Sequence, residues 1–288
     1  MAEFFSGYLE QYRLEGQYTE ALHRLGLARK MQGDVDGMLR TYEDAIRRYA
    51  NRLDALGLDL ILKDWVAAGQ TAKGHFPSDR IREQLAVAAE NRSDVARLRL
   101  LWALHELCGE PNAPAFGPAD LKSASPAVLE WIGRTHAAAQ PALAAAALEK
   151  VVDEYSDSPW VEDALGTWAD LEAAAGRYEK ALALYQQRFE QFPVGPKSGV
   201  SLKRAADMKF ALQRHDEARA DYLRILEVKE WRGPLWPESL YRVGECLLAQ
   251  GKLQEAFGYF QRVYVLYEGY PDWAGRAYLQ SGIVLEKL

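Results

Sequence analysis

Small and bulky residues alternate along the C-terminal half of the chain at a nearly constant spacing. The small residue is Ala144, Ala181, Ala218 and Ala256, at intervals of 37, 37 and 38 residues. A bulky residue follows four positions later, at Leu148, Tyr185, Tyr222 and Phe260. Apolar residues one helical turn apart are typical of amphipathic helices, so the pattern predicts a repeated helical unit.

The two residue types suit a pair of packed antiparallel helices. A small residue lets the two backbones approach, and a bulky residue one turn later fills the groove toward the next pair. The first helix of each pair shows a matching apolar position at Leu165, Leu202, Leu240 and Tyr278. We therefore predict an all-α chain built from helix pairs.

Glycine and proline mark the ends of the predicted helices. Gly176 and Gly251 are expected in the turns between paired helices, because glycine adopts the left-handed backbone that ends many helices. Prolines recur with the repeat at Pro159, Pro196, Pro234 and Pro271. Ser125-Pro126 and Ser158-Pro159 are interpreted as an N-cap followed by the first helical residue.

These positions resemble the tetratricopeptide repeat family, a helix-turn-helix unit of about 34 residues. One copy carries Gly244, Gly251, Ala256, Phe260 and Pro271, and another carries Gly176, Ala181, Tyr185 and Pro193. The longer spacing here is similar to that of bacterial envelope proteins, among them outer-membrane assembly lipoproteins and periplasmic cell-division coordinators. The resemblance implies a right-handed helical-repeat solenoid whose first helices line a concave groove.

The N-terminal part repeats less regularly. Two overlapping copies fit there, a weaker one with Gly16, Tyr18 and Ala21 and a better one with Gly26, Gly33, Tyr42 and Ala45. We predict an irregular helical segment over 1–108 and a proline-rich loop or hinge over 109–126. A regular array of about four repeats is predicted over 127–288, and its last helix either caps the array or is cut from a longer one.

Composition limits the partners. Hydrophobic residues make up 49% of the chain, enough for a continuous core, and the net charge of −6 is opposite to what a phosphate-binding surface requires. We therefore expect no nucleic-acid partner. No apolar run reaches the ~18 residues that cross a bilayer, and the N-terminus lacks a signal-peptide pattern. We expect no membrane insertion, with a cytoplasmic location for a complete chain and a periplasmic or envelope location for a fragment.

No residue pattern predicts catalysis, a cofactor or a metal. The five histidines are never three or four residues apart, so none forms a helical metal pair. Cys108 and Cys246 lie far apart in the sequence and belong to no metal or disulfide motif. Asp34 and Asp36 lack the further ligands of a calcium loop, and N-capping by Asp34 explains the pattern better. We predict a protein that is not an enzyme.

The candidate binding residues are polar positions of the last three first helices, which the resemblance places in the groove. They are Lys203, Arg204, Asp207, Tyr241, Arg242, Glu245, Arg276 and Gln280. Guanidinium groups bind carboxylates bidentately, so this set predicts an extended acidic peptide or a protein segment as partner, with Arg204, Arg242 and Arg276 exposed. The alternative is an ordinary solvated face, in which Asp207 and Glu245 pair with the cations of neighbouring helices.

Two classes of function follow. The first is a non-enzymatic scaffold that binds a peptide or protein segment in its groove. The second is a helical arm that positions a larger multidomain enzyme or envelope assembly, of which this chain is a fragment. In addition, the apolar residues of the last helix, Tyr278, Ile283, Leu285 and Leu288, predict self-association through that helix.

Overall fold

The computed structural model describes residues 18–72, 76–111 and 114–288, and these residues form helices and no strand. The predicted all-α helical-repeat fold is confirmed. The chain divides into two compact units, Met1–Val161 and Glu162–Leu288.

The first unit contains two regular helix pairs with three further helices between them. The first pair is α2 (Tyr18–Met31) and α3 (Val35–Tyr49), and the last is α7 (Pro126–His136) and α8 (Pro141–Glu154). Between them lie α4 (Leu58–Gly69), α5 (Pro77–Glu90) and α6 (Asp94–Trp102), a π-helical turn Ala103–Leu107 and a short 3₁₀ turn Asp120–Lys122. The π-helical turn continues α6 directly.

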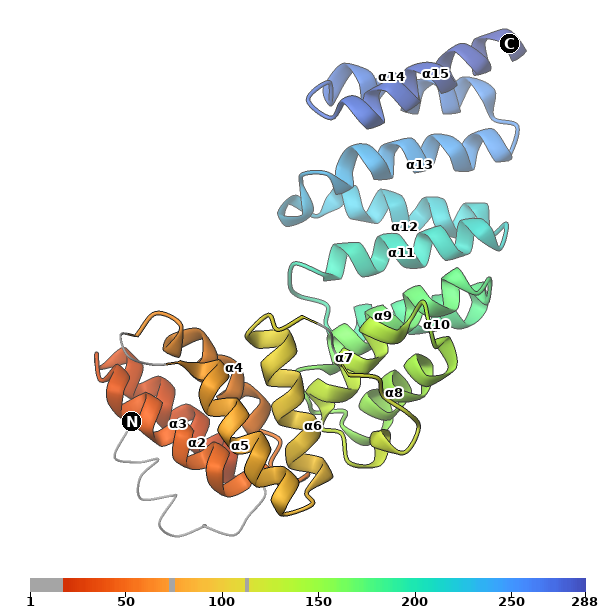
Figure 1. Ribbon diagram of the computed structural model, residues 1–288. Coiled ribbons are helices and arrows are strands. Elements are labelled where there is room, and N and C mark those ends of the chain that lie inside the picture. Colours follow the sequence, from red (N-terminus) through yellow and green to blue (C-terminus); the bar gives the residue numbers. More distant parts are fainter. Residues whose placement is uncertain (1–17, 73–75, 112–113) are drawn as a thin grey trace. The chain divides into compact units, whose positions relative to one another are not determined.

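The second unit is a regular stack of antiparallel helices in chain order, and it ends at the C-terminus of α15 (Figure 1). Its first helices are α9 (Val161–Ala174), α11 (Ser198–Ala211), α13 (Leu235–Ala249) and α15 (Pro271–Lys287). Its second helices are α10 (Tyr178–Gln191), α12 (His215–Glu227) and α14 (Leu253–Leu266). A short 3₁₀ turn, Lys229–Trp231, precedes α13.

The residues of the sequence repeat belong to the hydrophobic core. Ala144 and Leu148 are buried in α8 of the first unit, and the other three alanines and the bulky residues that follow them are buried in α10, α12 and α14 of the second unit. Phe260 of α14 lies so close to Gly244 of α13 that a Cβ on this glycine would stand 2.6 Å from the phenylalanine ring. Gly176 and Gly251 both have φ of 75°, which confirms their role in the turns. The repeated residues are therefore those through which the two helices of a pair pack and turn.

Near the N-terminus the second of the two overlapping copies is confirmed. The ring of Tyr42 in α3 packs over Gly26 of α2, and its hydroxyl donates to the carbonyl of His23 at 2.8 Å. Gly16 of the weaker copy lies outside the described residues. Asp34 caps α3 by accepting from the Gly37 N–H at 2.8 Å, as predicted.

One of the two predicted serine-proline helix starts is wrong. Pro126 is the first residue of α7, but Pro159 precedes α9 by two residues, because the segment Ser158–Trp160 forms a turn before the helix begins at Val161. Ser158 Oγ accepts from the N–H of Trp160 at 3.3 Å within that turn. A serine followed by proline thus also fits a turn that is not yet helical.

A fully buried ion pair, absent from the sequence analysis, joins the helices of the first unit. Arg99 Nε of α6 donates to Asp59 Oδ1 of α4 at 2.7 Å, and both side chains are fully buried. The same guanidinium donates to three carbonyls of the segment before α4, those of Ala50, Arg52 and Ala55, at 3.2, 2.9 and 3.4 Å. One arginine therefore donates to three carbonyls of the segment that connects α3 with α4.

Asp59 also holds the start of α7. Its Oδ1 accepts from Ser125 Oγ at 3.0 Å, and its Oδ2 accepts from the N–H of Ala127 at 3.3 Å. A first-turn N–H of a helix has no intrahelical partner, so this carboxylate performs the capping that Ser125 was expected to perform. The network thus connects α4, α6 and α7.

The described part of the proline-rich segment packs within the first unit. Phe116 is buried, with its ring edge-to-face against Trp131 at 5.2 Å, and Asp120 accepts from Arg97 at 2.8 Å. The boundary between the two compact units falls after Val161. The division into segments 1–108, 109–126 and 127–288 stays a prediction.

A buried glutamate closes the first turn of the second unit. The carboxylate of Glu172, in the last turn of α9, accepts from Trp168 Nε1 at 3.0 Å and from Arg177 Nε, and Lys180 lies 3.0 Å away. Burial raises the pKa of Glu172, but the bonds from Arg177, Lys180 and Trp168 outweigh it, so the pKa lies below its ordinary value. The ionised form is thus stabilised by folding.

This pKa shift predicts a dependence of stability on pH. A carboxyl with a lowered folded-state pKa contributes stability above its unfolded pKa of about 4.3, and this contribution is lost as pH falls through the folded value. We expect the free energy of unfolding of wild type to fall more steeply than that of Glu172→Gln between about pH 6 and about pH 3. Urea unfolding at several pH values tests this, and equal slopes for the two proteins would contradict it.

Candidate functional site

The predicted binding residues all lie on three first helices of the second unit, α11, α13 and α15. Helix α11 contacts α13, and α13 contacts α15, whereas no comparable contact joins α12 with α14 within residues 162–288. The first helices therefore lie closer to one another than the second helices do. We call the surface of α11, α13 and α15 that carries these polar residues the first-helix face.

Tyrosines of the second helices bind carboxylates of the first helices. Tyr222 of α12 donates to Asp207 of α11 at 2.7 Å, and Tyr185 of α10 donates to Asp170 of α9. Burial and the adjacent Asp207 raise the pKa of Tyr222, so its hydroxyl keeps the proton that it donates. Asp207 is thus fixed by its own helix pair, and it is only half-buried.

The third repeat replaces this contact. Phe260 stands where Tyr222 stands one repeat earlier, and it has no hydroxyl to offer. Glu245, at the position of Asp207, accepts instead from Arg242 at 2.7 Å. The carboxylate at this position is therefore held in both repeats, by a tyrosine in one and by an arginine in the other.

Lys203 and Arg242 are engaged within the protein. Lys203 is buried, with Nζ 3.0 Å from Asp207 and 2.7 Å from Glu238 of the next first helix. Arg242 lies 3.8 Å from Asp207 in addition to its bond with Glu245. The expectation that Arg242 is exposed is wrong, because these carboxylates hold it half-buried. Pairing across neighbouring helices accounts for both cations.

Arg204 and Arg276 remain available. Both are exposed, and neither has a carboxylate within ion-pair distance among the residues that the structure describes. The Arg276 guanidinium lies over the ring of Trp273 at 5.0 Å, and that ring packs against Tyr241 at 5.5 Å. Tyr241 is buried, and Gln280 is half-buried and hydrogen-bonded to it. The accessible charge of the first-helix face is therefore positive and sits on α11 and α15.

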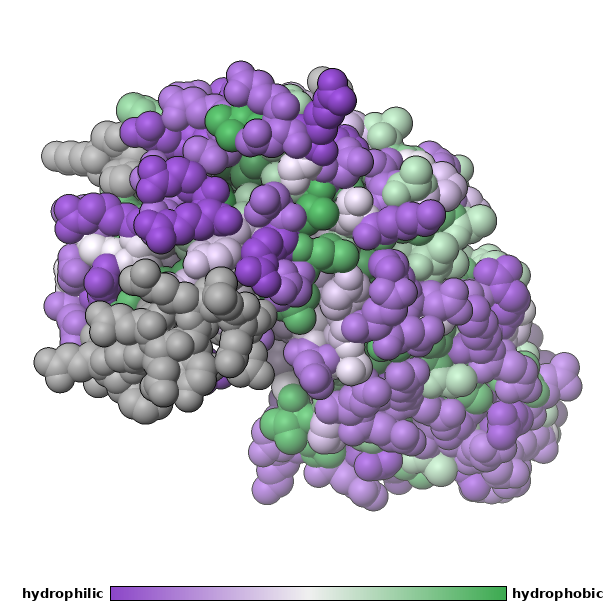
Figure 2. Space-filling model, turned by 90° about the horizontal axis from the view of Figure 1, so that it is seen from below, coloured by the Kyte–Doolittle hydropathy of each residue, from purple (hydrophilic) through white to green (hydrophobic). Residues whose placement is uncertain are grey.

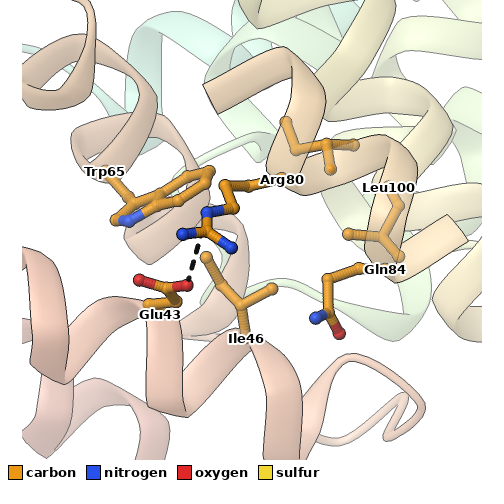
Figure 3. A pocket seen from close by; sticks show the side chains of 7 residues that line it. Glu43, Ile46, Trp65, Arg80, Gln84 and Leu100 are labelled. Atoms are coloured by element: carbon orange, nitrogen blue, oxygen red, sulfur yellow. Dashed lines mark ion pairs between the residues drawn. The ribbon is translucent and has the colours of Figure 1, made fainter. Parts of the chain in front are cut away.

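The first unit contains a small pocket between α3, α4, α5 and α6 (Figure 3). Its volume of about 20 Å³ is enough for a single water molecule. Trp65 and the ion pair of Arg80 with Glu43, at 4.0 Å, stand around it, and the Trp65 indole N–H has no hydrogen-bond partner in the described part of the chain. The pocket is too small to hold a substrate.

Over the described ranges, the side chains form no cluster of three or more residues that could hold a metal ion. None of the described helices combines the length and the apolar character that a membrane crossing needs. Hydrophilic residues cover most of the coloured surface in Figure 2, and hydrophobic ones show there as small separate groups.

Two family models match parts of the chain. A family model described as tetratricopeptide repeat matches residues 197–268, and a second one with the same description matches residues 20–52 and 127–158. No curated protein matches the chain.

Similar solved structures include three helical-repeat proteins. A tetratricopeptide repeat protein from Parabacteroides merdae is 15% identical, with 96% of this chain and 90% of that chain covered and a TM-score of 0.38. Yeast Tom70 is 11% identical over 99% of this chain and 58% of its own, with a TM-score of 0.49. The tetratricopeptide repeat domain of P58(IPK) is 14% identical over 92% and 78%, with a TM-score of 0.25.

The helix pairs, their buried small and bulky residues and the turn glycines define a helical-repeat protein. Together with the family models, they show that residues 20–52, 127–158 and 197–268 form repeats of the tetratricopeptide repeat family. Members of this family serve as scaffolds for protein interaction and are typically not catalytic. The resemblance to bacterial envelope members stays a prediction.

Proposed function

We propose that this chain is a non-enzymatic scaffold that binds an acidic protein segment along the first-helix face of residues 162–288. The observation that carries the proposal is the pair of exposed arginines, Arg204 and Arg276, which have no carboxylate partner within the described ranges, on a face whose other cations are paired. Arginine forms two parallel hydrogen bonds with a carboxylate, so each of the two can hold one acidic side chain.

The spacing of the helices suggests the length of the bound segment. From α11 to α15 there are two steps between neighbouring first helices, each about 8–10 Å for packed helices. An extended chain advances about 3.3 Å per residue, so about five or six residues span this distance. We therefore propose a segment with two acidic residues about five or six positions apart. Trp273 and Gln280 of α15 are half-buried and supply an aromatic and an amide contact beside it, while the buried Tyr241 of α13 supports the Trp273 ring.

The proposal is tested with labelled synthetic peptides of about ten residues, long enough to span the site. The peptides carry two glutamates at separations from two to nine positions, and binding is followed by fluorescence anisotropy. Arg204→Glu/Arg276→Glu is expected to weaken binding of the preferred peptide by about tenfold or more, because two attractive contacts become repulsive. Arg242 is left intact, since its substitution would remove the hydrogen bond to Glu245 and one of the cations beside Asp207.

The matched control is Arg224→Glu/Arg262→Glu on the second helices α12 and α14. Both arginines are exposed, and each lies over an aromatic ring at 4.9 Å, as Arg276 does at 5.0 Å. The control therefore changes the net charge by the same amount without touching the first-helix face. Equal weakening in both double variants would mean that only overall charge matters, and the proposed site would be refuted.

A further inference from the structure

Helix α15 exposes an apolar face. The corresponding face of α13, the first helix of the preceding repeat, is buried. The residues of this face are Gly275, Tyr278, Leu279, Gly282 and Leu285, which recur three, four and seven positions apart and so lie on one side of the helix. Tyr278 is 69% exposed and Leu285 is 55% exposed. We call this surface the α15 face.

The preceding first helix shows what covers such a face. Leu240 and Leu247 of α13 stand one repeat before Tyr278 and Leu285, and they are only 8% and 1% exposed. Helix α14 packs against α13 and seats Phe260 on Gly244. The apolar face of α13 is therefore covered by the second helix α14, which places an aromatic ring on Gly244.

In α15 this position is Gly282, 38 residues after Gly244, and a Cβ placed on it would meet nothing within 4 Å. Gly275 is open in the same way. The Tyr264 ring of α14 contacts the Tyr278 ring at a centroid distance of 4.9 Å, but Tyr278 stays 69% exposed and both glycines stay open. The α15 face is thus shaped to receive a helix that carries an aromatic residue.

The chain itself offers a helix of this kind. The covering helices carry a small residue four positions before the aromatic ring, as in Ala256 and Phe260. Helix α15 has the same pair in Ala274 and Tyr278, and its tyrosine is exposed. We propose that the α15 face binds the α15 helix of a second copy of this chain, so that two copies form an antiparallel pair.

A two-fold axis determines the register of this pair. If Tyr278 of one copy lies on Gly282 of the other, then symmetry places the second Tyr278 on the first Gly282. In an antiparallel pair the same register sets Leu285 opposite Gly275, so each large side chain faces a glycine. Both glycines are helical and allow close approach of the two backbones.

Sedimentation velocity of the 288-residue chain tests the pair, over about a hundredfold range of concentration because association follows mass action. We expect wild type to shift from monomer to dimer, and Gly282→Arg to weaken the association by about tenfold or more, since a long charged side chain then occupies the tyrosine site. Arginine favours helix over glycine, so the variant keeps its fold.

The matched control is Gly258→Arg on α14, a helical glycine that also has open space around it. It is expected to dimerise as wild type does. A wild-type chain that stays monomeric at every concentration would overturn the proposal and would leave a helix of another protein as the occupant. A dimer that survives Gly282→Arg would overturn it too, because another surface must then hold the copies together.

Disulfide trapping tests the register itself. In a Cys108→Ser background, chains with Tyr278→Cys are mixed with chains carrying Gly282→Cys and mildly oxidised. The remaining native Cys246 is buried and does not react readily. The expected product is the mixed dimer in preference to either homodimer, and a mixture without that preference would overturn the register. Since no peptide is present, neither experiment depends on binding at the first-helix face.

Discussion

Replacing Arg99 by methionine is expected to lower the free energy of unfolding of residues 1–161 by about 3–5 kcal/mol. The variant leaves the Asp59 carboxylate fully buried without its cation, and three carbonyls of the segment before α4 lose their donor. Truncating one partner of a buried ion pair is costly because the remaining charge stays away from water. The free energy of unfolding of Arg99→Lys should lie between those of wild type and Arg99→Met, because an ammonium group keeps the charge but cannot form the same fork of hydrogen bonds.

The effect should stay local, because a repeat contacts mainly its neighbours. Hydrogen exchange measured by mass spectrometry separates the two units, and we expect faster exchange in α4, α6 and α7 with little change in residues 162–288. Arg47→Met is the control, because Arg47 pairs with Asp44 at an exposed site and its loss should cost less than about 0.5 kcal/mol. Equal protection of α4, α6 and α7 in Arg99→Met and Arg47→Met would contradict the role assigned to the network.

Phe260→Ala is expected to destabilise the second unit by about 3–5 kcal/mol, the usual cost of removing a buried aromatic ring. The ring is fully buried between α13 and α14 and packs on Gly244, with Tyr241 at a centroid distance of 5.4 Å. Its removal leaves a cavity that α13 and α14 can fill only by moving closer together.

The same helix provides the comparison for Phe260→Ala. Val265 of α14 is largely exposed, so Val265→Ala should change stability by less than about 0.5 kcal/mol. Urea unfolding followed by circular dichroism measures both variants. If Phe260→Ala unfolds at the same urea concentration as Val265→Ala, the packing account of the repeat is wrong.

The fold could be predicted from the sequence because its main determinant is periodic. Ala256, Phe260 and Gly251 recur as Ala181, Tyr185 and Gly176. The alanines and the aromatic residues are buried, and the glycines have the positive φ of a turn. A helical repeat buries nearly the same contacts in every copy, so one set of residue types is enough to identify it. The start of α9 was missed because the Ser158–Pro159 turn uses the same residue types as a helix N-terminus.

The polar contacts could be predicted only where their residues recur with the spacing of the repeat. Asp170, Asp207 and Glu245 are 37 and 38 residues apart, and that spacing could have indicated that the tyrosine in the second helix binds a carboxylate in the first. The pair of Asp59 with Arg99 occurs once, 40 residues apart in an irregular segment, so no periodic signal marks it.

The state of the charged residues on the first-helix face also required the structure. Lys203 and Arg204 are adjacent in sequence and carry the same charge. One is buried between Asp207 and Glu238, and the other is exposed, because successive helical residues point about 100° apart. Which of the two can bind a partner therefore depends on the neighbouring first helix, which the local sequence does not reveal.

The most direct test of the proposed function is a charge exchange between the protein and its peptide. The peptide preferred by wild type, with its two glutamates replaced by lysines, is titrated against Arg204→Glu/Arg276→Glu. If the arginines contact the acidic side chains, the lysine peptide should bind this variant and not wild type, while Arg224→Glu/Arg262→Glu should continue to prefer the glutamate peptide. If the lysine peptide binds both double variants equally well, the first-helix face does not hold the charged residues of the partner.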